Sequence, residues 1–104
     1  MLRISIVERT NQRRLVLEGK LVAPWARELK PAYKEASAEL NGRELVIDVK
    51  GLTAISEDGE NVLFELTKEG ASFRRPGVFT KHILKRLVRK VRRNVQEGRD
   101  DRKY

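Results

Sequence analysis

Hydrophobic and polar residues alternate at the start of the chain. Leu2, Ile4 and Ile6 occupy every second position, which is the period of a strand with one buried face. Leu15 and Leu17 repeat the alternation after a polar stretch, so a second strand follows across a hairpin-like turn. We therefore expect strands over Leu2–Glu8 and Arg14–Glu18, a turn over residues 9–12, and a strand end at Gly19.

A continuous apolar run replaces this alternation in the middle of the chain. Glu44–Val49 is mostly apolar, which is typical of a strand buried on both of its faces. We expect this strand to be central and nearly fully buried, and to end before a turn marked by Gly51 and Thr53. Its apolar residues are Leu45, Val46, Ile47 and Val49.

The segment between these strands has apolar residues at the three-to-four-residue spacing of a helix. Pro24 suits the first position of this helix, which we expect to end near residues 41–42. Pro31 predicts a kink or a later effective start, or else two short turns of helix on either side of it. We expect Trp25 and Tyr33 to lie in the core rather than bind a ligand, although Trp25 is early enough to line a surface groove. The apolar stripe is Trp25, Leu29, Tyr33, Ala36 and Leu40.

A second helical segment follows the buried strand and begins with acidic residues. Ser56 is suited to cap this helix, and Glu57, Asp58 and Glu60 occupy its first turn, where the helix dipole favours negative charge. We expect a helix over residues 56–69. Its buried face is formed by Val62, Leu63 and Leu66.

The remaining chain predicts two further elements. After a helix end at Gly70 we expect a short strand over residues 71–74, a break at residues 75–77, and a long basic helix over residues 79–95 that Gly98 ends. The resulting order, β-β-α-β-α-β-α, predicts an α/β fold with a mixed four-stranded sheet whose first strand is an antiparallel edge. We expect a single domain over residues 1–96 and a charged flexible tail over residues 97–104.

Positive charge is concentrated in the C-terminal third. Residues 1–73 carry 11 Lys/Arg and 12 Asp/Glu, whereas residues 74–104 carry 12 Lys/Arg and 3 Asp/Glu. Residues 74–93 contain nine Lys/Arg and no acid, and self-repulsion on that scale usually implies an anionic partner. Nucleic acid, an acidic protein surface and an anionic membrane all have the required charge. The candidate contact residues are Arg74, Arg75, Lys81, Lys85, Arg86, Arg89, Lys90, Arg92 and Arg93.

A helical wheel divides the final helix into an apolar and a basic side. The apolar arc covers about 100°, and we expect it to pack on the domain while the basic side stays in water. Phe73 and Phe79 flank two arginines and would give weak support to stacking with unpaired bases. The residues of the apolar arc are Thr80, Leu84, Leu87, Val88, Val91 and Val95.

Little in the sequence supports catalysis. The chain has no cysteine, which excludes a disulfide framework and a thiolate nucleophile. The one histidine, His82, lies near Lys81 and Lys85 on the polar side of the last helix, a pattern typical of a solvated imidazole. We therefore expect no enzymatic activity, no metal and no cofactor. The chain lacks a signal peptide pattern and any apolar run near the ~20 residues that span a bilayer, so we expect a cytoplasmic protein.

Two motifs resemble STAS domains, the family of anti-sigma factor antagonists and sulfate-transporter tail domains. LVLEGKL, residues 15–21, is similar to the family's second strand and the turn after it. GLTAISEDG, residues 51–59, resembles the family's switch region, in which a D-S-S-G motif starts a helix after a buried strand. Aligned on Gly59, this motif places Glu57 where the family's kinases phosphorylate a serine.

The resemblance covers residues 1 to about 88, with the family's last strand replaced by the basic helix, and implies a STAS-like fold. It also implies a non-catalytic regulatory module that docks a kinase-like or other protein partner. A glutamate carries one negative charge and phosphoserine about −1.5 to −2, so residue 57 would be a fixed imitation of the phosphorylated state. The alternative function is nucleic-acid binding through the basic helix. Peripheral attachment to anionic lipid through the same helix is a third possibility. The implied docking residues are Ser56, Glu57, Asp58 and Gly59.

Overall fold

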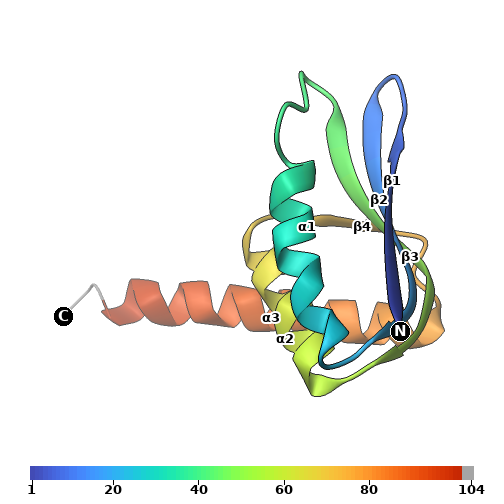
Figure 1. The fold of residues 1–104 in the computed structure, drawn as a ribbon. Coiled ribbons are helices and arrows are strands. Elements are labelled where there is room, and N and C mark those ends of the chain that lie inside the picture. Colours follow the sequence, from blue (N-terminus) through green and yellow to red (C-terminus); the bar gives the residue numbers. More distant parts are fainter. Residues whose placement is uncertain (102–104) are drawn as a thin grey trace.

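The strands form one mixed sheet in the order β1-β2-β3-β4 (Figure 1). β1 (Leu2–Glu8) pairs antiparallel with β2 (Gln12–Leu21), while β2, β3 (Glu44–Ile55) and β4 (Ser72–Arg74) run parallel to one another. The computed structural model describes residues 1–101, and the side chains of residues 1–93. The predicted α/β class, with a mixed four-stranded sheet and an antiparallel first strand at its edge, is confirmed.

Helical segments connect the parallel strands. A 3-10 turn, η1 (Trp25–Glu28), and α1 (Leu29–Ala36) join β2 to β3, and α2 (Glu57–Lys68) joins β3 to β4. Figure 1 shows α1 and α2 on one face of the sheet and α3 packed against α2, with the C-terminal part of α3 extending beyond the rest of the protein. α3 follows β4 and spans Val78–Asp101.

β2 and β3 are longer than the sequence pattern predicts. Gly19, expected to end a strand, and Gly51, expected in a turn, are both paired within the sheet. A Cβ atom at Gly51 would lie 2.9 Å from the Leu17 carbonyl oxygen, so the glycine allows the two bulged strands to stay close together. The register shifts beside these positions interrupt the hydrophobic periodicity, which explains why the predicted strands are too short.

The prediction of a single helix from Pro24 to residues 41–42 is wrong. η1 comes first, and α1 begins at Leu29, which places Pro31 in the first helical turn, where its missing N–H has no intrahelical partner to lose. The helix ends early because Glu39 has a φ of 55° and therefore cannot continue a right-handed helix. The later helix start, one of the outcomes expected from Pro31, is the one that the structure has.

The core lies between the sheet and the helices. Ile47, Val49, Leu63 and Leu66 are at most 1% exposed, as the sequence pattern predicts. Leu45 is only half-buried, which corrects its expected full burial. Trp25 is also a correction, because its side chain is 37% exposed at the surface of η1 instead of buried in the core. Tyr33 is partly buried and packs against the core.

The last helix is longer than expected at its C-terminal end. α3 continues to Asp101, so neither residue 95 nor Gly98 ends it. A Gly inside a helix costs about 0.5–1 kcal/mol relative to Ala, which is not enough to stop a helix by itself. Residues 97–101 of the expected flexible tail are therefore helical, and residues 102–104 lie outside the described residues.

Candidate functional site

The start of α2 is fastened to the end of β2. The Ser56 backbone N–H donates to the Leu21 carbonyl at 3.1 Å, and the Ser56 hydroxyl accepts from the Gly59 N–H at 3.3 Å. Ser56 thus caps the helix, as its position in the sequence predicts. The cap occupies the only hydroxyl in the Ser56–Gly59 motif.

Gly59 fixes the position of the first turn by a close backbone contact. A Cβ atom at this position would lie 2.1 Å from the Leu21 carbonyl oxygen, so a side chain there would force the helix away from the strand. The contact leaves Glu57 and Asp58 exposed on the solvent side of the same turn. Of the four implied docking residues, the structure therefore places two acids on the surface, with the serine and the glycine holding them in place.

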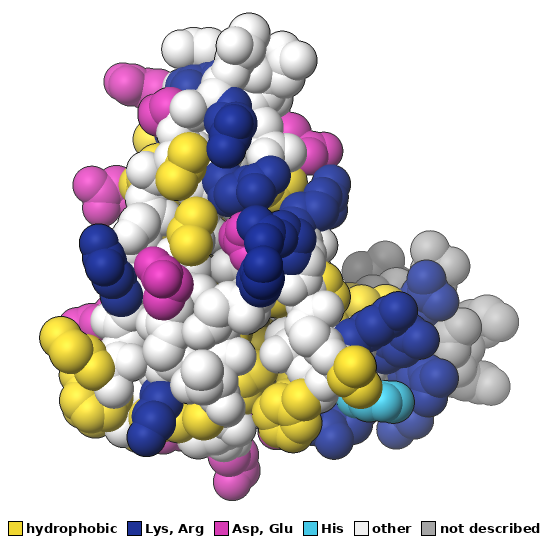
Figure 2. All heavy atoms as spheres, turned by 90° about the vertical axis from the view of Figure 1, so that its right-hand side faces the viewer, with side chains coloured by type: hydrophobic (Ala, Val, Ile, Leu, Met, Phe, Trp, Pro, Cys, Tyr) yellow, Lys and Arg dark blue, Asp and Glu magenta, His cyan; other side chains and the backbone are white. Residues whose placement is uncertain are grey.

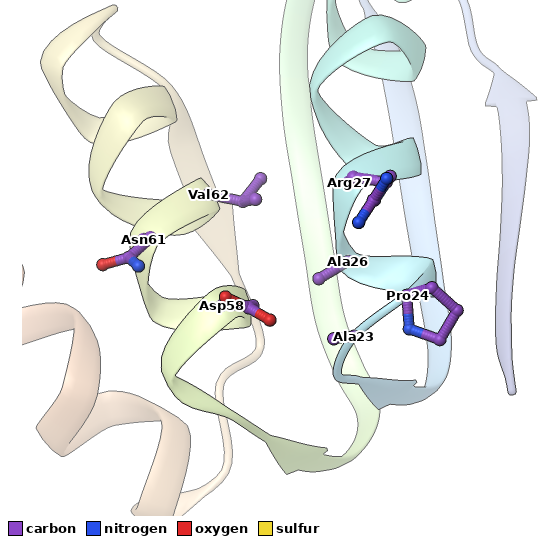
Figure 3. A pocket seen from close by; sticks show the side chains of 7 residues that line it. All are labelled: Ala23, Pro24, Ala26, Arg27, Asp58, Asn61 and Val62. Atoms are coloured by element: carbon purple, nitrogen blue, oxygen red, sulfur yellow. The ribbon is translucent and has the colours of Figure 1, made fainter.

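A hollow of about 250 Å³ lies between this turn and η1 (Figure 3). Asp58, Asn61 and Val62 line it from α2, and Pro24 and Arg27 lie on the opposite wall. That wall was not predictable from the sequence, because residues about thirty positions apart meet only through the fold. Trp25, for which a surface groove was the alternative to the core, is not among the residues lining this hollow.

A second hollow, of about 310 Å³, separates the same turn from α3. Arg86 pairs with the carboxylate of Glu60, and the Lys90 ammonium lies 4.6 Å from the centre of the Phe64 ring. Both contacts link α3 to α2. The acidic turn and the basic helix, which are separate features in the sequence, are therefore neighbours in the fold.

The nine candidate cations differ in whether they already contact a partner within the protein. Arg74 pairs with Glu44 at 3.2 Å, and Arg75 pairs at 3.4 Å with the buried Asp48. With Arg86 and Lys90 engaged on α2, these residues already have partners within the domain. Six of the nine are exposed on α3 and in no ion pair within residues 1–93, and one of them, Lys90, contacts the Phe64 ring. The other five are Lys81, Lys85, Arg89, Arg92 and Arg93.

Asp48 is a buried carboxylate outside the predicted sites. Its side chain is 6% exposed, and its Oδ2 atom lies 3.6 Å from the Arg14 guanidinium. Its Oδ1 atom accepts the Lys50 backbone N–H at 3.0 Å. A charged residue inside an otherwise apolar strand was the available signal, since buried carboxylates are normally paired. The arrangement holds Arg75 on the sheet rather than free for a partner.

The buried side of α3 is rotated from the predicted apolar arc. Thr80, Ile83 and Leu87 are each 4% exposed, whereas Val88 is 39% exposed. Ile83 lies outside the predicted arc, yet it belongs to the hydrophobic core. Leu84 and Val91 are half-buried. The side chain of Val95 lies outside the described residues.

Figure 2 shows Lys and Arg side chains crowded around α3 at the lower right of the view, next to the histidine and to hydrophobic side chains. His82 is exposed there among these cations. Within the described part of the chain, no group of His, Cys, Asp and Glu side chains is arranged to hold a metal ion. None of the described helices is both long and apolar enough to cross a membrane.

Comparison with known proteins supports the fold. No protein-family model matches the chain, and neither does any curated protein. The crystal structure of a protein named Mglu is similar, with a TM-score of 0.56 and 16% sequence identity over 71% of this chain. The chain corresponds to only 20% of the length of Mglu. At this identity the similarity concerns the fold alone.

Proposed function

We propose that this chain is a non-catalytic regulatory module that binds a protein partner through the first turn of α2. The observation that carries the proposal is the combination of a rigid backbone with exposed charge in this turn. The cap at Ser56 and the contact at Gly59 fix the turn, while Glu57 and Asp58 face solvent. A preorganised surface binds a partner with little loss of conformational entropy.

The two hollows beside the turn give the surface a shape that a partner can match. Asn61 borders both of them, with η1 on one side and α3 on the other. The wall at η1 is mostly apolar, with Pro24 and Ala26, and carries one exposed cation, Arg27. An apolar contact flanked by fixed charges is typical of protein–protein interfaces.

The resemblance to anti-sigma factor antagonists supplies the class of partner. In that family the equivalent turn docks a serine kinase, which modifies a serine at the position of Glu57. Here a permanent carboxylate stands at that position, and the Ser56 hydroxyl is engaged in the helix cap. We expect the partner to be kinase-like and to bind without switching this chain by phosphorylation.

Site-specific photo-crosslinking tests the docking surface. A photoreactive amino acid placed at Asn61 in the host cell should capture one main protein, and mass spectrometry should identify it as an ATP-binding kinase of the sigma-regulatory type. The same amino acid at the exposed Glu35 of α1 is the matched control. Capture at Asn61 should be lost when Glu57 and Asp58 are changed to Lys. Equal capture at both positions, or capture that survives the charge reversal, would contradict the proposal.

Phosphate analysis of the native protein tests the absence of a switch. The intact mass of protein purified from its host should show no stoichiometric phosphate. Phosphate on Ser56 would mean that the hydroxyl had moved by one position and that the switch is retained. A Glu57→Ser variant, incubated with the captured kinase and ATP, should become phosphorylated at residue 57 if the partner is of the expected class.

A further inference from the structure

The outer side of α3 combines cations with exposed apolar side chains. Val78 is 78% exposed and Phe79 is 62% exposed, both at the start of the helix. Large hydrophobic side chains this exposed, side by side, usually mark an interaction site. The exposed cations that follow them along the helix are Lys81, Lys85, Arg89, Arg92 and Arg93.

This outer side is exposed because the opposite side of α3 packs against the rest of the protein. Thr80, Ile83 and Leu87 are buried against the domain, which fixes the rotation of the helix. Figure 2 shows α3 at a corner of the protein, with the Lys and Arg side chains around its outside. A flat surface could therefore contact the helix without unfolding any part of the domain.

Apolar surface also continues along one flank of the helix. Leu84 and Val88 line an open hollow of about 380 Å³ beside Pro76. Val88 is 39% exposed, and the partly buried Leu84 packs against the core. The cations that line the same hollow are Lys81, Lys85, Arg89 and Arg92. Apolar and positively charged groups thus alternate over the same exposed surface.

We propose that this surface attaches the protein to an anionic membrane. Val78 and Phe79 enter the interfacial region, and the cations of α3 face the lipid head groups, the arrangement found in peripheral amphipathic helices. A second copy of the chain would bring like charges together. A nucleic acid would neutralise the cations but leave Val78 in water, because its phosphates offer no apolar environment. The membrane accommodates both kinds of side chain.

Vesicle co-sedimentation of the full chain tests this assignment. Wild type should bind vesicles of phosphatidylglycerol and phosphatidylcholine in equal parts, and should not bind vesicles of phosphatidylcholine alone. Lys85→Gln with Arg89→Gln should lower the partition constant about 25-fold, since each cation near an anionic surface contributes about fivefold. The matched control is Lys30→Gln with Lys34→Gln on α1, which removes the same charge from an exposed site and should change binding little.

The apolar residues separate lipid from nucleic acid. Val78→Ser with Phe79→Ser should lower vesicle binding at least about tenfold while leaving the affinity for a short DNA duplex unchanged. Chemical unfolding of each variant confirms that the fold is intact. Equal binding of wild type to neutral and anionic vesicles, or no binding to either, would overturn the proposal. It would also be overturned if the duplex were bound tightly and the serine variant bound vesicles as well as wild type.

Discussion

α2 and α3 pack against each other, but the fold holds them in different ways. α2 is capped by Ser56, touches the sheet directly at Gly59, and buries Leu63 and Leu66 completely. α3 is longer, yet within residues 78–93 only a narrow stripe that includes Ile83 and Leu87 is buried. An amphipathic sequence pattern can therefore have two different structural consequences. In α2 it specifies packing, and in α3 it leaves most of the helix surface available for binding.

The two helices also differ in the sign of their charge. α2 concentrates acids in its first turn, where the helix dipole and the cap stabilise them. α3 has no acid in its first turn and carries cations along its exposed side. The Arg86–Glu60 pair joins the two sets, so each helix neutralises a small part of the other. The two helices thus present surfaces of opposite charge that meet at this pair.

The largest expected effect concerns the buried face of α2. Leu63→Ala should lower the free energy of unfolding by about 2–5 kcal/mol, because the side chain is 0% exposed and its removal leaves a cavity. Val88→Ala on the exposed flank of α3 should stay within about 0.5 kcal/mol. Urea unfolding of both variants measures the difference. Similar losses in the two helices would remove the contrast between them.

The close contact at Gly59 gives the next effect. Gly59→Ala should cost about 1–3 kcal/mol, since its Cβ would lie 2.1 Å from the Leu21 carbonyl oxygen and α2 would have to shift. Gly77→Ala, next to α3, has no atom within 4 Å of the added Cβ and serves as the matched control. It should change stability by no more than about 0.5 kcal/mol. If Gly59→Ala left the free energy of unfolding unchanged, the start of α2 would be able to move.

Removing the helix cap should have a smaller effect. Ser56→Ala should lower the free energy of unfolding by about 1 kcal/mol, because the Gly59 N–H loses its side-chain acceptor. Ser56→Asp keeps an acceptor at the cap and should recover most of the loss. Thermal and urea unfolding measure both variants. If Ser56→Asp were as unstable as Ser56→Ala, the cap would not be the role of this residue.

A charge cluster away from both helices should have the smallest effect. The hydrogen bond from Arg13 lowers the pKa of Glu8, and the charges of Arg13 and Arg43 lower it further, against a raising effect of desolvation. A carboxyl group with a lowered pKa stabilises the fold above its unfolded pKa, and this contribution is lost as the pH falls through the folded pKa. Between about pH 6 and pH 3, Glu8→Gln should therefore lose slightly less stability than wild type. An identical pH dependence would mean that the ion pairs of Glu8 contribute nothing.

Local signals predicted most of the fold. The alternation in β1, the apolar run in β3 and the cap before α2 each depend on neighbouring residues, and each is where the pattern places it. Features that depend on two distant segments were not predictable. Gly51 has the features of a turn residue in the sequence, and only its pairing with β2 places it in the sheet. Ile83 lies outside the predicted apolar arc, and only the packing of α3 in the fold buries it.

The candidate sites show the same limit. Ser56 and the acids after it were recognisable because helix caps follow a local code. The wall at Pro24 and Arg27 and the adjacency of Glu60 to Arg86 arise only from tertiary packing. The nine cations of residues 74–93 are equivalent in the sequence, whereas in the fold Arg75 pairs with Asp48. Composition predicts that a basic surface exists, and the fold decides which residues belong to it.

Urea unfolding of a charge variant of α3 tests most directly whether the exposed side of that helix is separate from the fold. Lys85, Arg89 and Arg93 are changed together to Gln, while Arg86 is kept because it pairs with Glu60. Surface charges contribute about 0–1 kcal/mol each, and removing mutual repulsion offsets part of that, so the midpoint and slope of unfolding should match wild type closely. A loss of more than about 2 kcal/mol would show that these side chains support the fold and are not a free binding surface.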